Sequence, residues 1–112
     1  MPYKKERLEK ILEREIGSSL LMESKDDRLK FVTITKVSLT NDLSLATVYY
    51  TVLGSSEQQI ATDKLLQEAK GFLRSIVSKQ LTIRKTPDLK FKFDDSYEKG
   101  NKIDEILRGL QK

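Results

Sequence analysis

The sequence contains no cysteine and no histidine. Without these residues there can be no disulfide, no zinc site built on thiolates or imidazoles, and no catalytic arrangement of the Ser-His or Cys-His kind. An enzyme built from this sequence would have to use carboxylates, lysine, tyrosine or a hard metal ion.

Long apolar runs are missing as well. None approaches the roughly 18 residues of a membrane span. The N-terminal segment MPYKKERLEKILEREIG carries charges through its apolar positions, which is not typical of a signal peptide. We therefore expect a cytoplasmic protein without membrane contact, in which residues 1–112 form a single domain.

Positive charge is in excess, with 21 Lys and Arg against 17 Asp and Glu, so the net charge is +4. The excess alone is a weak indication of a polyanionic partner. Its distribution is more informative, because the segment 69–85 has five basic residues and no acidic one. These residues are Lys70, Arg74, Lys79, Arg84 and Lys85. We predict that they contact RNA phosphates, and the alternative is an ordinary solvated helix face.

Hydrophobic periodicity predicts three helices and three strands. Helices are expected over residues 3–22 and 55–81 and in a short final segment around 103–110, and strands over 31–39, 45–53 and 89–93. The order is helix, strand, strand, long helix, strand, helix. It predicts an α+β fold, in which a hairpin and a helical crossover build a three-stranded mixed sheet with helices on one face.

Two local patterns leave alternatives open. In the first strand, Ile34 favours one inward phase and Val37 the other, and either a bulge or a twisted edge would reconcile them. At the start of the long helix, a capping box can be formed by Ser55 with Gln58 or by Ser56 with Gln59.

The third strand alternates Leu89, Phe91 and Phe93 with Lys90 and Lys92. We interpret the apolar side as core and the lysines as solvent-facing. The alternative is that the aromatic rings stack on bases. Tyr49, on the less apolar side of the second strand, is a weaker stacking candidate.

Gly71 lies inside the long predicted helix, where glycine costs about 1 kcal/mol relative to alanine. Two explanations are open: the glycine allows the helix to bend, or it permits close packing against a neighbour. The order of elements matches one arrangement of the KH fold, whose GXXG loop clamps RNA. No two glycines of this chain have that spacing, and Ala69-Lys70-Gly71 stands in its place.

Seven short fragments stand in a specific order and spacing: 27–35, 42–49, 52–54, 69–74, 87–91, 94–96 and 100–103. On these fragments, nearly the whole chain resembles the bacterial ribosome-binding factor A family. The chain departs from the family in having Asp27 where proline is usual and Lys102 where arginine is common. The resemblance implies a type II KH-like RNA-binding domain in which a helix kink at Ala69 and Gly71 replaces the GXXG loop.

The resemblance also implies a function. It is that of a non-catalytic, cofactor-free and monomeric maturation factor that binds 16S rRNA within the free 30S small ribosomal subunit. Such a factor assists late 30S assembly and processing of the 5′-end region of 16S rRNA. One alternative is a basic KH-like RNA-binding or protein-interaction module that is not tied to the ribosome.

Carboxylates and loop charges supply the remaining candidates. Asp94, Asp95 and Glu98 could hold Mg²⁺ in a metal-dependent enzyme, although helix capping by Asp95 and Glu98 explains two of them. Arg28, in the loop before the first strand, either contacts RNA or pairs with a neighbouring carboxylate.

Overall fold

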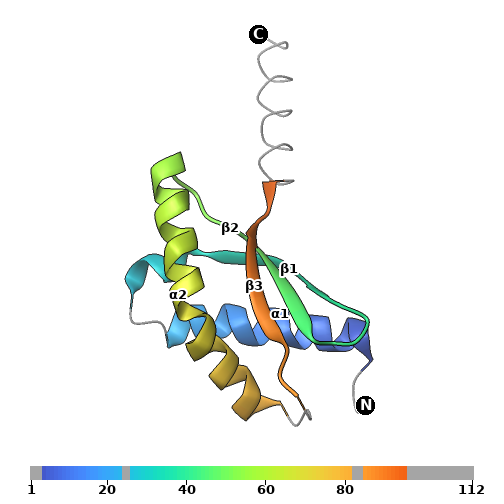
Figure 1. Cartoon of the computed structure of the whole chain (residues 1–112). Coiled ribbons are helices and arrows are strands. Elements are labelled where there is room, and N and C mark those ends of the chain that lie inside the picture. Colours follow the sequence, from blue (N-terminus) through green and yellow to red (C-terminus); the bar gives the residue numbers. More distant parts are fainter. Residues whose placement is uncertain (1–3, 24–25, 82–84, 96–112) are drawn as a thin grey trace, which may run out of the picture.

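The computed structural model describes residues 4–23, 26–81 and 85–95. Within them the chain forms two α-helices, a 3₁₀ helix and three strands (Figure 1). In chain order these are α1 (Lys5–Met22), the 3₁₀ helix η1 (Asp27–Phe31), β1 (Thr33–Leu39), β2 (Leu45–Thr51), α2 (Ser56–Gln80) and β3 (Asp88–Phe93). The predicted final helix lies outside the described residues.

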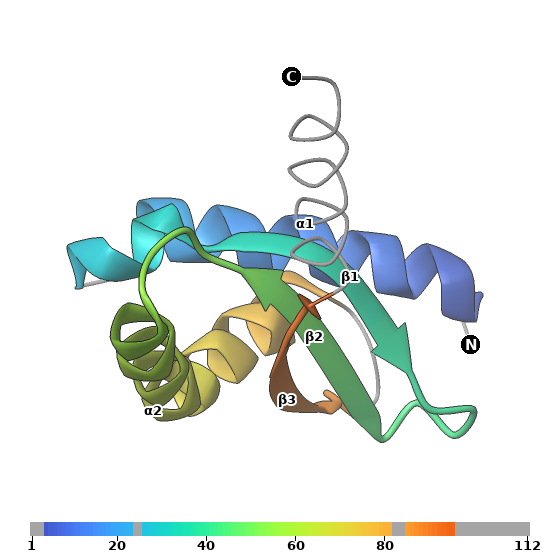
Figure 2. The same ribbon diagram turned by 90° about the horizontal axis from the view of Figure 1, so that it is seen from above.

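The three strands form one mixed sheet in the order β1-β2-β3. β1 and β2 are antiparallel, whereas β2 and β3, which α2 connects, are parallel. α1 lies against β1 and α2 against β3, so that the helices cover one face of the sheet (Figure 2). This arrangement confirms the predicted α+β fold for the described part of the chain. None of the described helices is long and apolar enough to cross a bilayer.

The core fills the space between the helices and the inner face of the sheet. On β2 the inner side chains are Ala46, Val48 and Tyr50, which are all buried, and they alternate with half-exposed residues. Leu89 and Phe91 are buried on β3, and Phe93 packs against the core. The interpretation of this side of β3 as core is therefore confirmed.

A β-bulge resolves the conflicting phases of the first strand. Ile34 pairs with Tyr50 and Lys36 pairs with Tyr49, so Thr35 is an extra residue on β1. Because of this insertion, Ile34 and Val37 both face the core although they differ in phase. Of the two alternatives open from the sequence, the bulge is the one present.

The start of α2 is fixed by a capping box formed by Ser55 and Gln58. The Gln58 amide donates to Ser55 Oγ at 3.2 Å, and the Ser55 amide donates to Gln58 Oε1 at 2.7 Å. Each side chain thus satisfies a backbone donor that the first helical turn leaves without a partner. The alternative pair, Ser56 with Gln59, does not form the box.

Several predicted boundaries are wrong. Phe31 belongs to η1 rather than to a strand and is 75% exposed, because Asp26 caps a 3₁₀ turn by accepting the Arg28 amide. β2 ends at Thr51, before Leu53, which is 88% exposed. α2 ends at Gln80, since Leu81 turns to an extended conformation that buries its side chain.

Candidate nucleic-acid interface

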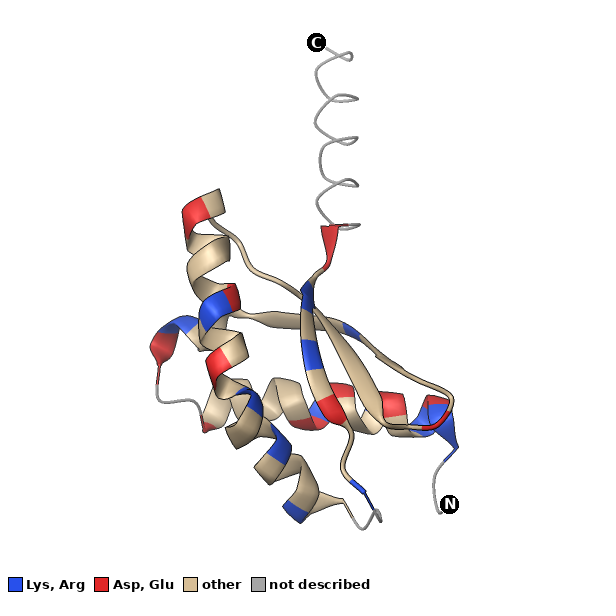
Figure 3. Cartoon of the chain, in the orientation of Figure 1, with Lys and Arg blue, Asp and Glu red and all other residues tan. Residues whose placement is uncertain are grey.

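Charge is unevenly distributed along α2. The first half carries three acidic residues, Glu57, Asp63 and Glu68, and one lysine, Lys64. The second half carries three basic residues and no acidic one (Figure 3). Acidic residues near a helix N-terminus and basic residues near its C-terminus also interact favourably with the helix dipole. The dipole therefore explains part of this distribution without any ligand.

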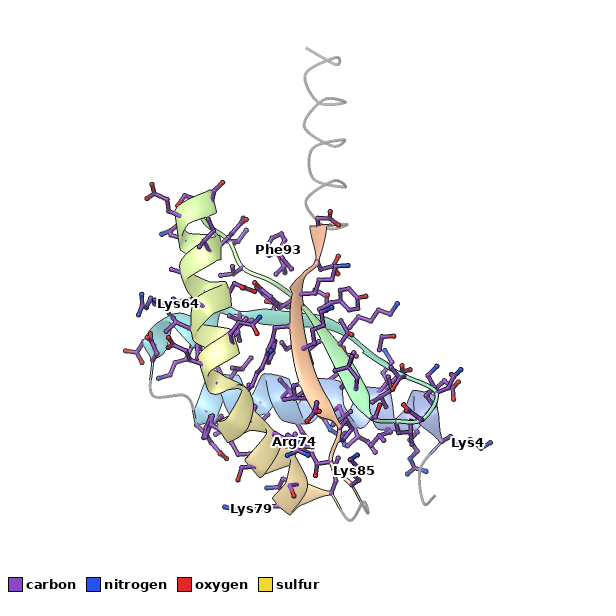
Figure 4. The ribbon with its side chains drawn as sticks, viewed as in Figure 1. Lys4, Lys64, Arg74, Lys79, Lys85 and Phe93 are labelled. Carbon is purple, nitrogen blue, oxygen red and sulfur yellow. The ribbon has the colours of Figure 1, made fainter. Side chains whose placement is uncertain are left out.

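The predicted phosphate-binding residues are all at or near the surface where they are described. Arg74, Lys79 and Lys85 are exposed and Lys70 is half-buried, whereas Arg84 lies outside the described residues. Figure 4 shows Lys79 pointing away from Arg74 and Lys85. The basic end of α2 thus presents its charges on more than one side of the helix.

Arg74 is engaged by its own chain. Its Nη2 donates to the Thr86 carbonyl at 2.9 Å and its Nε to the Pro87 carbonyl at 3.4 Å. Nε also lies 3.4 Å from the Asp88 carboxylate. These contacts hold the start of β3 against α2. They also place the Asp88 carboxylate beside the segment 69–85, which has no acidic residue of its own.

Gly71 is exposed on α2, and a methyl group built on it would meet no atom of another element within 4 Å. Close packing against a neighbour, one of the two explanations for this glycine, is therefore wrong. The ribbon of α2 changes direction partway along its length (Figure 1). A kink set by Ala69 and Gly71 stays a prediction.

The charges of the loop before β1 are paired with one another. The Arg28 guanidinium donates to both Asp26 carboxylate oxygens, at 3.1 and 2.8 Å, and Lys30 lies 3.0 Å from Asp27. The hydrogen bonds from the Arg28 side chain and amide hold the pKa of Asp26 below its usual value. The internal carboxylate pair is thus the alternative that the structure shows for Arg28.

The carboxylates suggested for a metal ion are only partly described. The Thr35 hydroxyl donates to Asp94 at 2.6 Å, which ties the end of β3 to the bulge of β1. Glu98 lies outside the described residues. Within the described ranges, no cluster of three carboxylates capable of holding a metal is present.

The outer face of the sheet carries a feature that the sequence did not reveal. Lys36, Tyr49 and Lys92 are direct neighbours across the three strands. Lys36 Nζ lies 5.8 Å from the centre of the Tyr49 ring. The sequence indicated Tyr49 and Lys92 separately, but the place of Lys36 depends on the bulge, which shifts the register by one residue.

Comparisons with known proteins agree on one family. A family model described as Ribosome-binding factor A matches residues 4–107. A Staphylococcus saprophyticus protein named ribosome-binding factor A is 43% identical over 112 residues, which is 100% of this chain and 98% of that protein.

Two known structures share the fold. The crystal structure of ribosome-binding factor A from Thermus thermophilus has a TM-score of 0.70 at 27% identity, covering 80% of this chain and 96% of that chain. A homology model of the Thermus thermophilus factor, fitted into the cryo-EM map of its complex with the 30S subunit, has a TM-score of 0.68 at 25% identity. It covers 83% of this chain and 97% of that one.

Proposed function

The chain belongs to the ribosome-binding factor A family, and on that premise we propose that it binds the free 30S ribosomal subunit as a non-catalytic maturation factor. It contacts 16S rRNA, assists late 30S assembly and favours processing of the 5′-end region of that RNA. It acts as a monomer in the cytoplasm. A relative with the same fold, fitted into the map of a 30S complex, supports the choice of particle.

The basic half of α2 is the observation that carries the proposal. Lys70 and Lys79 on α2, and Lys85 in the segment that follows, are in no ion pair with the described residues. Lysines that are free of internal partners can neutralise phosphates and release bound counterions. Contacts of this kind position a protein on RNA and do not read its sequence.

Arg74 has a different role in this proposal. Its Nε and Nη2 already bind the backbone before β3. Only the third guanidinium nitrogen, Nη1, therefore remains for a phosphate. We assign it chiefly to fixing the position of β3 relative to α2. Ala69 and Gly71 set the direction of the basic half of the helix.

The proposed mechanism needs no chemistry from the protein. A factor that binds one conformation of the rRNA more tightly than another shifts the population toward the first. A difference of about 1.4 kcal/mol in binding free energy changes the ratio of the two conformations tenfold. Release then follows when the RNA reaches a conformation to which the factor binds weakly.

Co-sedimentation tests this function. The purified protein is centrifuged with immature 30S subunits, mature 30S subunits and assembled ribosomes at several salt concentrations. The test variant changes Lys70, Lys79 and Lys85 to glutamine. The matched control changes Lys4, Lys10 and Lys64 to glutamine, which removes the same charge from other surfaces. Lys4 and Lys64 are labelled in Figure 4, and Lys10 lies on α1.

We expect salt-sensitive binding to free subunits, which the test variant loses and the control keeps. Failure of the parent protein to bind any ribosomal particle would refute the function and favour a basic KH-like module with another partner. Binding that is insensitive to salt would favour an apolar protein contact instead, because phosphate contacts weaken steeply with ionic strength.

A further inference from the structure

We propose that the outer face of the sheet, opposite α1 and α2, binds a single strand of RNA with one base stacked on Tyr49. The proposal goes beyond the function assigned to α2 and does not require the ribosomal particle. The two surfaces would hold two separate segments of RNA. Figure 3 shows basic residues on β1 and β3.

The geometry is that of an aromatic ring between two cations. Tyr49 lies on the middle strand, and the register places Lys36 beside it on β1 and Lys92 beside it on β3. Neighbouring strands are about 4.8 Å apart, so the backbones of the two lysines are separated by about 10 Å across the ring. A nucleotide stacked on Tyr49 would have its phosphate within reach of either side chain.

The lysines of this face are not neutralised by the described part of the protein. Lys36, Lys90 and Lys92 are exposed, and none is in an ion pair there. Of the nearest acidic residues, Asp88 is paired with Arg74, whereas Asp94 accepts a hydrogen bond from the neutral Thr35 hydroxyl and keeps its charge. The three lysines outnumber this carboxylate. The face therefore carries an excess of positive charge around the Tyr49 ring, which complements a polyanion.

The form of the surface favours a single strand over a duplex. Bases of a duplex are stacked on one another and cannot also stack on a side chain. A single strand offers unstacked bases, and each base–aromatic contact contributes about 1–3 kcal/mol with little dependence on sequence. Tyr49 is half-buried, and its neighbours along β2 on this face, Thr47 and Thr51, are small hydroxyl residues. Lys36 Nζ lies over the ring, so a stacking base would displace this ammonium group, which can then bind the phosphate of the same nucleotide.

A hollow of about 360 Å³ beside Thr51 can accept a second base. Its lining includes Thr33 and Thr51 together with Phe31 and Leu53, which are both exposed. Thr51 follows Tyr49 by two residues, or about 7 Å along the strand. This is about twice the 3.4 Å interval of stacked bases, so bases in the two places would be unstacked from each other.

An ordinary explanation for the row of Lys36, Tyr49 and Lys92 across the strands is stabilisation of the sheet. Cross-strand pairs of this kind contribute about 0.2–1 kcal/mol to strand pairing, and an uncovered sheet face normally carries polar residues. This explanation predicts a change of stability without a change of RNA binding. Measuring both quantities on the same variants separates the two explanations.

The experiment is a binding titration by fluorescence anisotropy on the full chain. The probes are a short labelled single-stranded RNA of mixed sequence and a hairpin of the same composition. Tyr49→Leu removes the ring, and Tyr49→Phe keeps it. Lys36→Gln with Lys92→Gln removes the flanking charges, and Lys4→Gln with Lys64→Gln is the matched control. Thermal unfolding of each variant confirms that it is folded.

We expect tighter binding of the single strand than of the hairpin. Tyr49→Leu should weaken it about fivefold or more, the lower end of one stacking contact, whereas Tyr49→Phe should not. The lysine variant should lower the slope of log affinity against log salt by about 1.4, or 0.7 per lost phosphate contact on a single strand.

The variant with Lys70, Lys79 and Lys85 changed to glutamine is titrated in the same way. Three results would overturn the proposal: no binding of single-stranded RNA by the parent, equal binding by Tyr49→Leu, or a loss of binding that appears only in this α2 variant. In the last case the function assigned to α2 still stands. If the parent binds single-stranded RNA through Tyr49 but binds no ribosomal particle, the proposal for the sheet stands and the proposed ribosomal function fails.

Discussion

Replacing Tyr50 by phenylalanine would remove one hydroxyl group and leave the rest of the core in place. Tyr50 is 1% exposed, and its hydroxyl donates to Asp63 Oδ1 on α2 at 2.8 Å. Its ring meets Phe91 and Phe93 edge to face, with centres 6.5 and 5.6 Å apart. Tyr50→Phe keeps these ring contacts, so it isolates the bond between β2 and α2.

The expected loss follows from the type of hydrogen bond. Bonds to charged groups contribute about 1.5–3 kcal/mol, and we expect the lower end because Asp63 is only half-buried and water can replace the donor. A loss of about 1.5 kcal/mol lowers Tm by about 6 °C in a domain of this size. The urea dependence of the free energy of unfolding should not change, since the surface exposed on unfolding is the same.

Alkaline pH gives a second test of the same bond. Burial, followed by the hydrogen bond to Asp63, raises the pKa of Tyr50 above its ordinary value of 10.0. The contribution to stability is therefore complete below about pH 10 and is lost as the pH rises toward the higher pKa of the folded state. We expect the difference between parent and Tyr50→Phe to shrink above pH 10.

Urea unfolding followed by circular dichroism measures both effects. Tyr49→Phe is the matched control, because Tyr49 is the next residue on the same strand and its hydroxyl makes no hydrogen bond to the described residues. The control should match the parent in stability. Equal stability of Tyr50→Phe and the parent at neutral pH would refute the assignment of this bond as a link between sheet and helix.

Three further predictions concern other contacts. Alanine in place of glycine at an open, exposed helix position ordinarily raises the free energy of unfolding by about 0.5–1 kcal/mol. If the bend of α2 depends on Gly71, chemical denaturation of Gly71→Ala will show no such gain. The full gain would contradict a kink at Gly71. Hydrogen bonds from Thr40 and then Ser44 lower the pKa of Asp42 from 3.8 to about 2. The stabilisation by ionised Asp42 is therefore present above pH 4 and lost as the pH falls toward 2. The stabilities of the parent and Asp42→Asn should converge near pH 2 in an acid titration, and a constant difference would exclude the ionisation of Asp42 as the cause. Arg74→Gln should lower the stability in thermal unfolding by about 1 kcal/mol. Arg74→Lys should be destabilised as well, because one ammonium group cannot replace the planar guanidinium. Full stability of either variant would argue against Arg74 as the contact that holds β3.

The two α-helices and three strands of the described part were predictable because each has a local signal. The alternation of Ala46, Val48 and Tyr50 identified β2 and its inner face. The two possible capping boxes, Ser55–Gln58 and Ser56–Gln59, placed the start of α2 to within one residue, and the structure shows the first. The conflicting phases of Ile34 and Val37 predicted an irregularity in β1. These signals arise within a few residues of one another, so the sequence alone expresses them.

Features that depend on contacts between distant residues were not predictable. One local feature was missed as well: Phe31 looked like the start of a strand, but it closes a 3₁₀ turn that Asp26 caps through the Arg28 amide. The neighbourhood of Lys36, Tyr49 and Lys92 depends on two strand registers and on the bulge. Arg74 looked like a free cation, because the carbonyls that it binds lie beyond the end of its helix.

The parallel pairing of β3 with β2 has a consequence for the order of folding. β1 and β2 are joined by a short turn, whereas β3 reaches β2 only after the 25-residue α2 has crossed over. Closing the longer connection costs more chain entropy, so we expect the β1–β2 hairpin to form first and β3 to join last. Until then one edge of β2 is open beside apolar side chains, and such an edge is a template for pairing with another chain. Because Arg74 holds the start of β3, we expect it to limit aggregation during refolding, and light scattering should show more aggregation of Arg74→Gln than of the parent.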